Sequence, residues 1–380
     1  MRRACQTALA ATALVLAWQA ATVWYNRDGD WTALFHTGAF ARVPPPLEAE
    51  QLHRIAGDPG YDGQFYHFIA HDPWMRRGFA PYVDNPRLRW RRILVPGLAW
   101  LAAAGQDGAI DVAYVAVTLA FVLAGSYWLS LYCQEHGRRA AWGLLFPLIP
   151  GVLVSIDRMT IDTAIAALCV AFALYLRSPV RLWVVLALAP LARETGLCLV
   201  AGACLWQRKR AAFYASAALP FLGWTAYVHA RTAPDHTAWL GWPFAGLVER
   251  TLHPVQFALS SRWLKQAAAL DYLALVGVWL ALALIARCAW RRSAGPLELA
   301  LYCLAALAVT LARADIWSGA YSFARTQTPL LVGLALLGLA SRSWLLLAPL
   351  ALTIARILFQ FQPQWKGVLR GILSHVRSIA

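Results

Sequence analysis

Residues 60–73, GYDGQFYHFIAHDP, place several polar side chains in a chain that is otherwise mostly apolar. Their spacing predicts an amphipathic helix over 63–72 that lies along a membrane surface. Three polar side chains would share one stripe of this helix, namely Gln64, His67 and His71. Tyr66 and Ala70 follow Asp62 at four-residue steps, so Asp62 would lie above the apolar face that packs on the rest of the protein.

Two roles are open to Asp62. As a helix N-cap it would accept a hydrogen bond from a free backbone N–H group. As an ionisable group at the edge of a membrane bundle it would more often be functional, and a carboxylate can serve as a general base. His67 and His71 could share a metal ion, but two ligands are too few for a metal site. We therefore predict no cofactor and leave a divalent metal open.

Arginines accompany acidic residues in further segments. A run after Asp84 contains four arginines, Arg87, Arg89, Arg91 and Arg92. The turn RET, 193–195, separates two apolar segments that are too short to cross a membrane alone, and broken helices of this kind often mark binding sites. The segment DRMTID, 157–162, supplies Asp157, Arg158 and Asp162. Another polar segment near the C-terminus, AYSFARTQTP, contains Arg325.

Two interpretations of these arginines remain open. Arginines near a membrane interface commonly extend towards lipid head groups, and Arg193 with Glu194 could simply cap a turn. The planar guanidinium group, however, presents a fixed fork of donors that suits a phosphate group. Because several such segments would gather on one side of the membrane, the sequence favours a phosphate-binding site.

Composition places the chain in a membrane. Of its 380 residues 60 % are hydrophobic and 14 % are charged, whereas soluble domains average about 25 % charged residues. The sequence predicts an all-α polytopic transmembrane bundle, with residues 1–380 forming one integral membrane domain. We expect about eleven spans, which are the first 25 residues, 109–131, 140–157, 160–176, 180–192, 196–206, 211–230, 267–289, 296–312, 327–340 and 343–360. Segment 92–105 breaks the alternation, so we expect a helix at the outer face or a re-entrant one, and whether it spans stays open.

Charge predicts the orientation of this bundle. With the N-terminus in the cytoplasm every inner loop is basic, as the positive-inside rule requires, and the net charge of +15 needs no nucleic-acid partner. Residues 26–91 then form an outer loop with juxtamembrane helices, which holds eight of the 19 acidic residues. The sequence of the tail, 363–380, predicts an amphipathic helix at the outer interface. The seven cysteines contain no CxxC motif, so neither disulfides nor a cysteine metal site are expected.

A large outer loop after the first span, with Asp62 followed by Tyr66 and Ala70, resembles the GT-C superfamily of membrane glycosyltransferases. Aminoarabinose transferases and protein O-mannosyltransferases begin that loop with an acidic residue ahead of a similar Tyr and Ala. The longer run, with RWRRILVPGLAWLAAAG and RETG after it, is similar to a bacterial group of multi-spanning proteins linked to cell-surface glycopolymers. The acidic pair of the family is reduced to one Asp followed by Gly63. An earlier cluster, RDGD, leaves Asp28 or Asp30 as the alternative base.

This resemblance implies an enzyme of the bacterial cytoplasmic membrane that works on its outer face. It would transfer a sugar from a polyprenyl-phosphate donor to a cell-envelope glycan or lipid, by an inverting single displacement with an Asp as base. We assign the base to Asp62. The residues expected to bind the donor phosphate are Arg87, Arg89, Arg193 and Arg325. Supporting residues are Tyr66, Gln64, His67, His71, Asp157, Arg158 and Glu194. The alternatives are a transporter or glycolipid flippase, or a partner in envelope assembly without catalytic activity.

Overall fold

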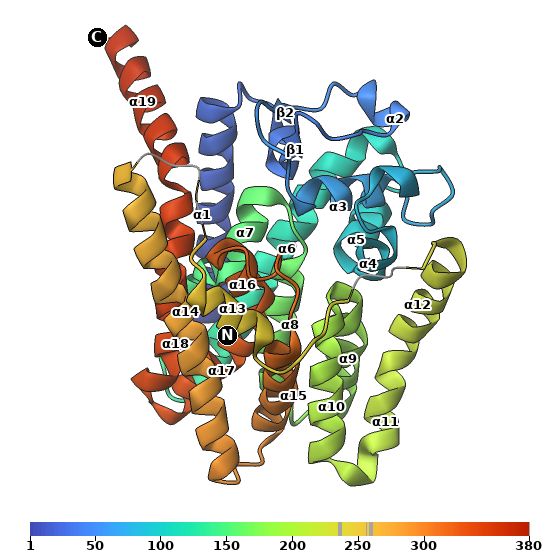
Figure 1. Ribbon diagram of the computed structural model, residues 1–380, viewed down its shortest axis with the longest axis vertical. Coiled ribbons are helices and arrows are strands. Elements are labelled where there is room, and N and C mark those ends of the chain that lie inside the picture. Colours follow the sequence, from blue (N-terminus) through green and yellow to red (C-terminus); the bar gives the residue numbers. More distant parts are fainter. Residues whose placement is uncertain (235–237, 256, 258–260, 380) are drawn as a thin grey trace.

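The computed structural model describes residues 1–234, 238–255, 257 and 261–379. Within these ranges the chain forms nineteen α-helices, six short 3₁₀ helices and one pair of two-residue strands (Figure 1). The prediction of a mostly helical protein is therefore confirmed.

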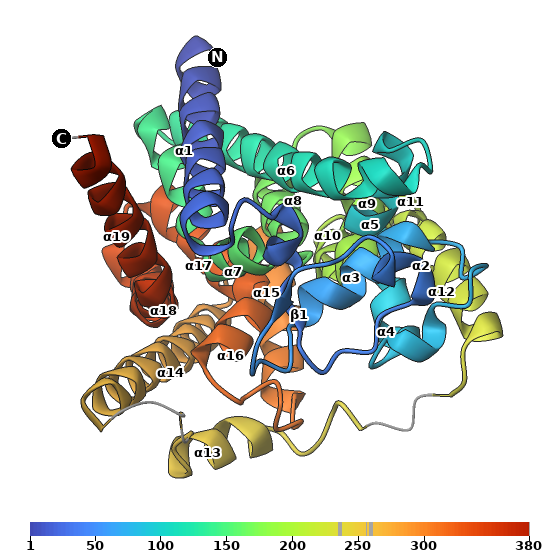
Figure 2. The ribbon, with the colours of Figure 1, turned by 90° about the horizontal axis from the view of Figure 1, so that it is seen from above.

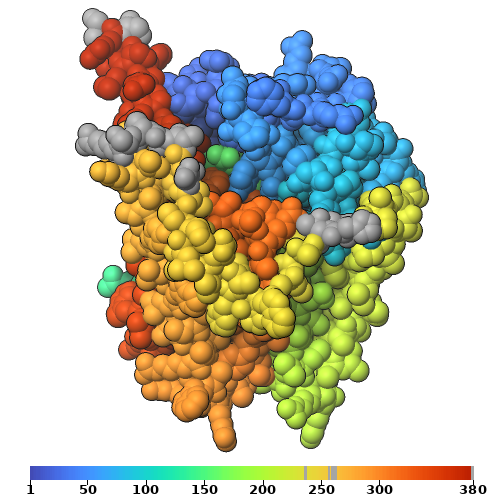
Figure 3. Space-filling model, viewed as in Figure 1, coloured from blue at the N-terminus to red at the C-terminus, as the bar shows by residue number. Residues whose placement is uncertain are grey.

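Short elements lie at one end of the molecule, between the long helices α1 (Arg2–Asn26) and α6 (Asp107–Glu135). They are η1 (Trp31–Phe35), β1 (Thr37–Gly38), α2 (Pro45–Glu48), β2 (Arg54–Ile55), α3 (Asp62–His71), η2 (Ala80–Tyr82), α4 (Pro86–Arg91) and α5 (Leu94–Ala102). The two strands pair in parallel. In the space-filling view these segments, coloured blue to cyan, cover that end of the molecule (Figure 3).

The remaining helices form the bundle. Its first half contains η3 (Ala140–Leu148), α7 (Pro150–Arg158), α8 (Asp162–Leu174), α9 (Pro179–Ala192), η4 (Glu194–Gly196), α10 (Leu197–Trp206), η5 (Arg208–Arg210), α11 (Ala211–Ala215), η6 (Ser216–Ala218) and α12 (Leu219–Arg231). Its second half contains α13 (Ala245–Leu252), α14 (Ser261–Trp290), α15 (Pro296–Thr310), α16 (Ala320–Thr326), α17 (Thr328–Ser341), α18 (Trp344–Gln360) and α19 (Gln362–Ile379).

Helix α8 forms the centre of the bundle. Apart from its first residues it is apolar on every side, and every side chain from Asp162 to Ala173 is buried. A helix that is apolar all round is expected to be surrounded by other helices. Seen from above, α8 lies in the interior, while α1, α12 and α14 lie towards the edge (Figure 2).

Three helices are long and apolar enough to cross a membrane, and three bent helix pairs raise the number of candidate spans to six within the described residues. The long helices are α1, α6 and α14, and the bent pairs are η3 with α7, α16 with α17, and α18 with α19. In each pair a proline lies in the first turn of the second helix, at Pro150, Pro329 and Pro363. Proline fits the first turn but cannot continue a preceding helix, so each apolar run bends there. Four apolar helices are shorter, namely α8, α9, α15 and the segment Glu194–Trp206. The structure therefore supports three to six spans, where the sequence predicts about eleven.

The acidic and basic connections lie at opposite ends of the molecule. The elements between residues 26 and 91 lie at the upper end in Figure 1, and the tip of α19 extends beyond the same end. The basic connections after α10 and between α14 and α15 lie at the lower end. The chain thus separates its acid-rich loop from two of its basic loops along its longest axis.

The predicted helix over 63–72 is present as α3, Asp62–His71, but its polar stripe does not face solvent as an amphipathic surface helix would require. Its polar stripe is buried, with His67 0 % and His71 2 % exposed, because this face packs against α6 and finds carboxylates there. Helix α5 lies within 92–105, the segment for which the sequence did not decide whether it spans the membrane. Its nine residues cover only about 14 Å, less than half of a bilayer core of about 30 Å.

The C-terminal segment is helical, as predicted, in α19. Its inner turns pack on α1, where Trp18 and Trp365 approach with ring centroids 4.3 Å apart. Val368 is buried, but five apolar side chains of α19 are exposed, namely Trp365, Leu369, Ile372, Leu373 and Val376. Ala380 lies outside the described residues.

Candidate functional site

A cavity of about 680 Å³ lies where α3, α4, the break between α9 and α10, and α16 meet. We name it the Asp62 cavity. One part of its wall carries five arginines, Arg89, Arg91, Arg92, Arg193 and Arg325. Three acidic residues share this part, Asp62, Glu194 and Asp315. Much of the remaining wall is apolar, formed by Leu88, Leu197, Leu240, Leu307, Leu311 and Ile316. The cavity therefore has a positively charged region beside an apolar one.

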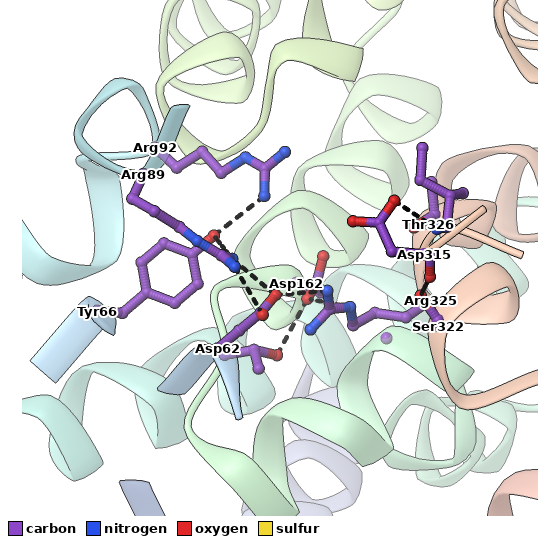
Figure 4. A network of polar contacts seen from close by, with 12 residues as sticks. Asp62, Tyr66, Arg89, Arg92, Asp162, Asp315, Ser322, Arg325 and Thr326 are labelled. Carbon is purple, nitrogen blue, oxygen red and sulfur yellow. Dashed lines mark hydrogen bonds and ion pairs between the residues drawn. The ribbon is translucent and has the colours of Figure 1, made fainter. Parts of the chain in front are cut away.

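Asp62 lies between two arginines in this wall (Figure 4). Its Oδ1 accepts a hydrogen bond from Nη2 of Arg89 at 2.8 Å, and its Oδ2 accepts one from Nη2 of Arg325 at 2.5 Å. Burial alone would raise the pKa of Asp62, but the charges and hydrogen bonds of Arg325 and Arg89 outweigh it and hold that pKa well below its usual range. The carboxylate is thus ionised, and both of its oxygens are occupied.

The sequence around Asp62 allows α3 to start close to other backbone. The residue that caps α3 is Tyr61, so Asp62 is the first residue of the helix rather than its N-cap. A Cβ on Gly63 would collide with the carbonyl oxygen of Arg158 and would lie 2.8 Å from that of Phe35. Glycine is therefore needed at this position to seat α3 against η1 and the end of α7.

Helix α4 brings Arg89 to the cavity. Asn85 caps this helix by accepting a hydrogen bond from the backbone N–H of Leu88 at 3.0 Å, and Pro86 occupies its first turn. Arg89 also donates to both carboxylate oxygens of Asp84, at 2.9 and 2.8 Å. Because its guanidinium group donates hydrogen bonds to both Asp62 and Asp84, Arg89 is held in one orientation.

A second set of contacts joins α3, α4 and η4. The Tyr66 hydroxyl accepts hydrogen bonds from Arg92 at 3.1 Å and from Arg89 at 3.4 Å. Nε of Arg92 donates to Glu194, at 3.1 Å to Oε2. Burial and the charge of Arg89 lower the pKa of Arg92, but Glu194 and Tyr66 outweigh them and raise that pKa above its usual value, so Arg92 remains charged. Glu194 thus neutralises part of the arginine cluster from the break between α9 and α10.

A third set of contacts lies deeper in the wall. Arg193 donates to the buried carboxylate of Asp162 and, at 3.2 Å, to the hydroxyl of Thr326. Nε of Arg325 lies 3.6 Å from Asp162. Within the described residues Nη1 of Arg325 is buried without a hydrogen-bond partner. A buried guanidinium donor with no partner favours an anionic ligand at this position.

The structure brings six of the predicted site residues together at the Asp62 cavity. They are Asp62, Tyr66, Arg89, Arg193, Glu194 and Arg325. Asp157 and Arg158 lie beside it: Arg158 and Arg325 flank the ring of Tyr61, at 4.7 and 5.1 Å from its centroid, and Asp157 accepts a hydrogen bond from Tyr321 at 2.5 Å.

Other predicted site residues lie elsewhere. Arg87 donates to the backbone oxygen of Thr232 at 2.9 Å and lines a separate cavity of about 390 Å³. Asp30 caps η1 by accepting from the backbone N–H of Thr32 at 2.9 Å, and Asp28 lies in the turn before it. Gln64 binds the backbone N–H of Gly38 at 3.2 Å, and His67 and His71 face α6.

Arg92 and Asp162 belong to the site although the sequence assigned them no role in it. Each lies in a segment that the sequence had singled out, the arginine run and DRMTID. Thr326 follows Arg325 directly, and Tyr61 precedes Asp62. The sequence could identify these charged segments, but local sequence does not show which side chains of a segment point into the cavity.

No family model matches the chain, and no curated protein or solved structure matches it.

Proposed function

We propose that this protein is a membrane glycosyltransferase that transfers a sugar from a polyprenyl-phosphate donor to a cell-envelope acceptor. The observation that supports it best is the Asp62 carboxylate held by Arg89 and Arg325 in a cavity that also has an apolar wall. Such a donor has the same two parts, a phosphate that needs fixed positive charge and a hydrocarbon chain that needs an apolar surface.

The donor would lie with its phosphate among the arginines and its chain along the apolar wall. Nη1 of Arg325, which has no hydrogen-bond partner among the described residues, would donate to a phosphate oxygen. Leu307 and Leu311, at and just beyond the end of α15, and Leu197, at the start of α10, would contact the first isoprene units. Both helices are apolar, so the rest of the chain would leave along them towards lipid.

Asp62 would act as the general base once the donor is bound. In the free protein its two arginines make it a weak base. A phosphate that draws the guanidinium groups of Arg89 and Arg325 towards itself weakens their hold on Asp62, and the pKa of the carboxylate rises. Asp62 then takes the proton of the acceptor hydroxyl while the hydroxyl oxygen forms a bond to the anomeric carbon. The bond from that carbon to the phosphate oxygen breaks, and the leaving phosphate keeps the electron pair beside the arginines.

The proposal includes a membrane arrangement of GT-C type. Counting the shorter apolar helices and the nearly continuous run Ala211–Arg231 as spans, beside the six candidates, gives eleven. We further propose the cytoplasmic membrane of a bacterium, with residues 26–91 and the Asp62 cavity on the outer face and the N-terminus inside. The opposite placement of the acidic and basic loops supports this orientation.

The test is transfer of labelled sugar from a panel of polyprenyl-phosphate hexoses and pentoses to a cell-envelope lipid extract by the purified protein. Asp62→Asn is expected to lower the rate by about 10² to 10⁴-fold, the usual contribution of a general base. Asp58→Asn is the matched control, because Asp58 lies in the same loop and pairs with His36 at 3.2 Å instead of lining the cavity. It should keep wild-type activity.

Other outcomes would redirect or end the proposal. If Asp62→Asn stays fully active and Asp28→Asn or Asp30→Asn does not, the base lies in the earlier cluster. If the wild-type protein moves the labelled lipid between leaflets of a vesicle and leaves the sugar attached, it is a flippase. If the wild type does neither, or all three Asp→Asn variants remain fully active, the catalytic role of the outer loop is refuted.

A further inference from the structure

On the side of α3 that faces α6, two histidines meet two carboxylates. His67 and His71 are one turn apart on α3, and Asp107 and Asp111 are one turn apart at the start of α6. Nε2 of His67 lies 2.5 Å from Asp111, and Nδ1 of His71 lies 2.9 Å from Asp107. Both imidazole side chains are fully buried, while the Asp111 side chain is 27 % exposed.

Three potential ligand atoms converge in this cluster. Nε2 of His71 points at Nε2 of His67, 3.2 Å away, and the ligand atoms of His67, His71 and Asp111 all lie within 4.8 Å of one another. In a tetrahedral zinc site, bonds of about 2.0–2.1 Å place neighbouring ligand atoms about 3.3 Å apart. The two histidine nitrogens already have this spacing. Asp111 would have to withdraw from His67 by less than about 1 Å, which its partly exposed side chain permits.

The surroundings orient both rings as metal ligands. Nδ1 of His71 binds Asp107, which leaves Nε2 with a free electron pair, and a carboxylate on the far nitrogen is the usual second partner of a zinc-bound histidine. Arg77 holds Asp107 in turn, through two hydrogen bonds of 2.6 and 2.9 Å. Among the described residues His67 has no such partner on Nδ1, but its ring stacks on Phe35 with centroids 4.0 Å apart.

Charge also favours a cation. Asp107 and Asp111 carry two negative charges, and Arg77 offsets one of them. The pKa of Glu50 is raised, first by partial burial and then by the charges of Asp111 and Asp107. The charges of His67 and Arg77 oppose this shift. A divalent ion would balance this group, and a water molecule would occupy its fourth position.

We propose that His67, His71 and Asp111 bind a divalent transition metal, with zinc the best match to two imidazoles and one carboxylate. The ion would fasten α3 to the first turns of α6. Since Asp62 and Tyr66 lie on another side of the same helix, the metal would hold α3 in the position that presents them to the Asp62 cavity. This inference does not rest on the proposed transferase activity, because the metal can be measured without any donor.

The experiment measures metal in the purified full-length protein. Wild-type protein equilibrated with zinc and then desalted is expected to retain about one equivalent by mass spectrometry of the metal, and cobalt(II) in its place should give the visible absorption of a tetrahedral site. His67→Gln and His71→Gln should lose at least 90 % of the bound metal. His53→Gln, a histidine of the same outer loop, should retain all of it.

Two further variants keep the test decisive if the buried histidine variants fail to fold. Asp111→Asn changes a partly exposed ligand and should also lose the metal. Asp107→Asn changes only the residue that orients His71, and it should weaken zinc binding about 10 to 100-fold. A chelator should lower the thermal midpoint of the wild type and leave that of Asp111→Asn unchanged. Less than a tenth of an equivalent in the wild type, or wild-type metal content in the folded Asp111→Asn protein, would show that the cluster is held by hydrogen bonds alone.

Discussion

A single carboxylate at the start of α3 is shared by two arginines that are distant from it in sequence. Arg89 lies 27 residues and Arg325 lies 263 residues from Asp62. This arrangement keeps Asp62 ionised and weakly basic until another anion competes for the arginines. In the proposed mechanism, donor binding would change the basicity of Asp62, because the arginines that would bind the phosphate are the ones that hold this carboxylate.

Two arginines of α4 provide a direct test of the phosphate site. Arg89→Gln should raise the apparent KM for the polyprenyl-phosphate donor about 10 to 100-fold, because a hydrogen bond to a charged group contributes roughly 1.5–3 kcal/mol. Arg87→Gln removes the same charge two residues away, from a side chain that binds Thr232 outside the cavity, and should leave KM unchanged. Equal losses in the two variants would indicate a general electrostatic effect instead of a defined site.

His36 should make the stability of the protein depend on pH. Burial, and then the charge of Arg158, lower the pKa of His36 to about 4, although Asp58 and Asp157 oppose the shift. The unfolded chain takes up this proton near pH 6.5, whereas the folded one resists it until about pH 4. Stability is therefore lost as the pH falls from about 6.5 to 4, by about 2 kcal/mol at pH 5.

The measurement compares wild type with His36→Asn by thermal unfolding in detergent at pH 7.5 and pH 5.0. His36 has φ of 55°, a conformation that asparagine tolerates, so the variant should fold. The wild type should lose more stability than the variant on acidification. Parallel losses in the two proteins would assign the pH dependence to other groups.

At the scale of elements, α3 organises both sites. One side of this helix supplies Asp62 and Tyr66 to the Asp62 cavity, and another supplies His67 and His71 to α6. Because the helix is buried on most sides, its position is fixed by neighbours that reach it from α4, α6, α7 and η1. A small shift of α3 would therefore disturb both sites together.

Gly63→Ala tests this dependence. The added methyl group would meet the backbone oxygen of Arg158, which cannot move aside as a flexible side chain could. Overpacking of this kind typically costs 1–3 kcal/mol, and we expect a lower thermal midpoint together with loss of transfer activity and of bound metal. Gly223→Ala is the control, since a Cβ there meets no atom within 4 Å and alanine favours the helical conformation of α12. A stable and fully active Gly63→Ala protein would contradict the close seating of α3.

At the scale of the whole molecule, the separation of acidic and basic loops to opposite ends predicts a membrane orientation. One end carries 26–91 and the tip of α19, and the opposite end carries the connection between α10 and α11 with that between α14 and α15. The exposed apolar side chains of α19 would contact lipid near the outer interface. The proposed eleven spans, an odd number, would place the two termini on opposite sides of the membrane.

Cysteine labelling in intact cells measures this orientation. In a Cys5→Ser background, a membrane-impermeant maleimide should label Glu48→Cys directly and Lys209→Cys only after the membrane is opened. Both residues are exposed, and α2, which contains Glu48, lies at the opposite end from the connection between α10 and α11, which contains Lys209. A reporter that fluoresces only in the cytoplasm should stay dark when it is fused after Ala380. Labelling of both cysteines from the same side would refute the orientation.

The sequence by itself determined the features that depend on neighbouring residues: the helical class, the helix that starts near Asp62 and the break at 193–195. These follow from apolar periodicity and from the backbone restrictions of proline and glycine, which act within a few residues. It also identified the charged segments that meet at the Asp62 cavity.

Only the tertiary structure decided which side chains of those segments meet. Arg87 and Arg89 are two residues apart on α4, so they point to different sides of the helix, and the packing of α4 on α3 selected Arg89. The packing of α3 on α6 likewise buries the polar face of α3, because carboxylates of α6 bind the histidines of that face. A helical pattern defines the faces of a helix, but the partners of each face come from residues far away in the chain, and only packing brings them there.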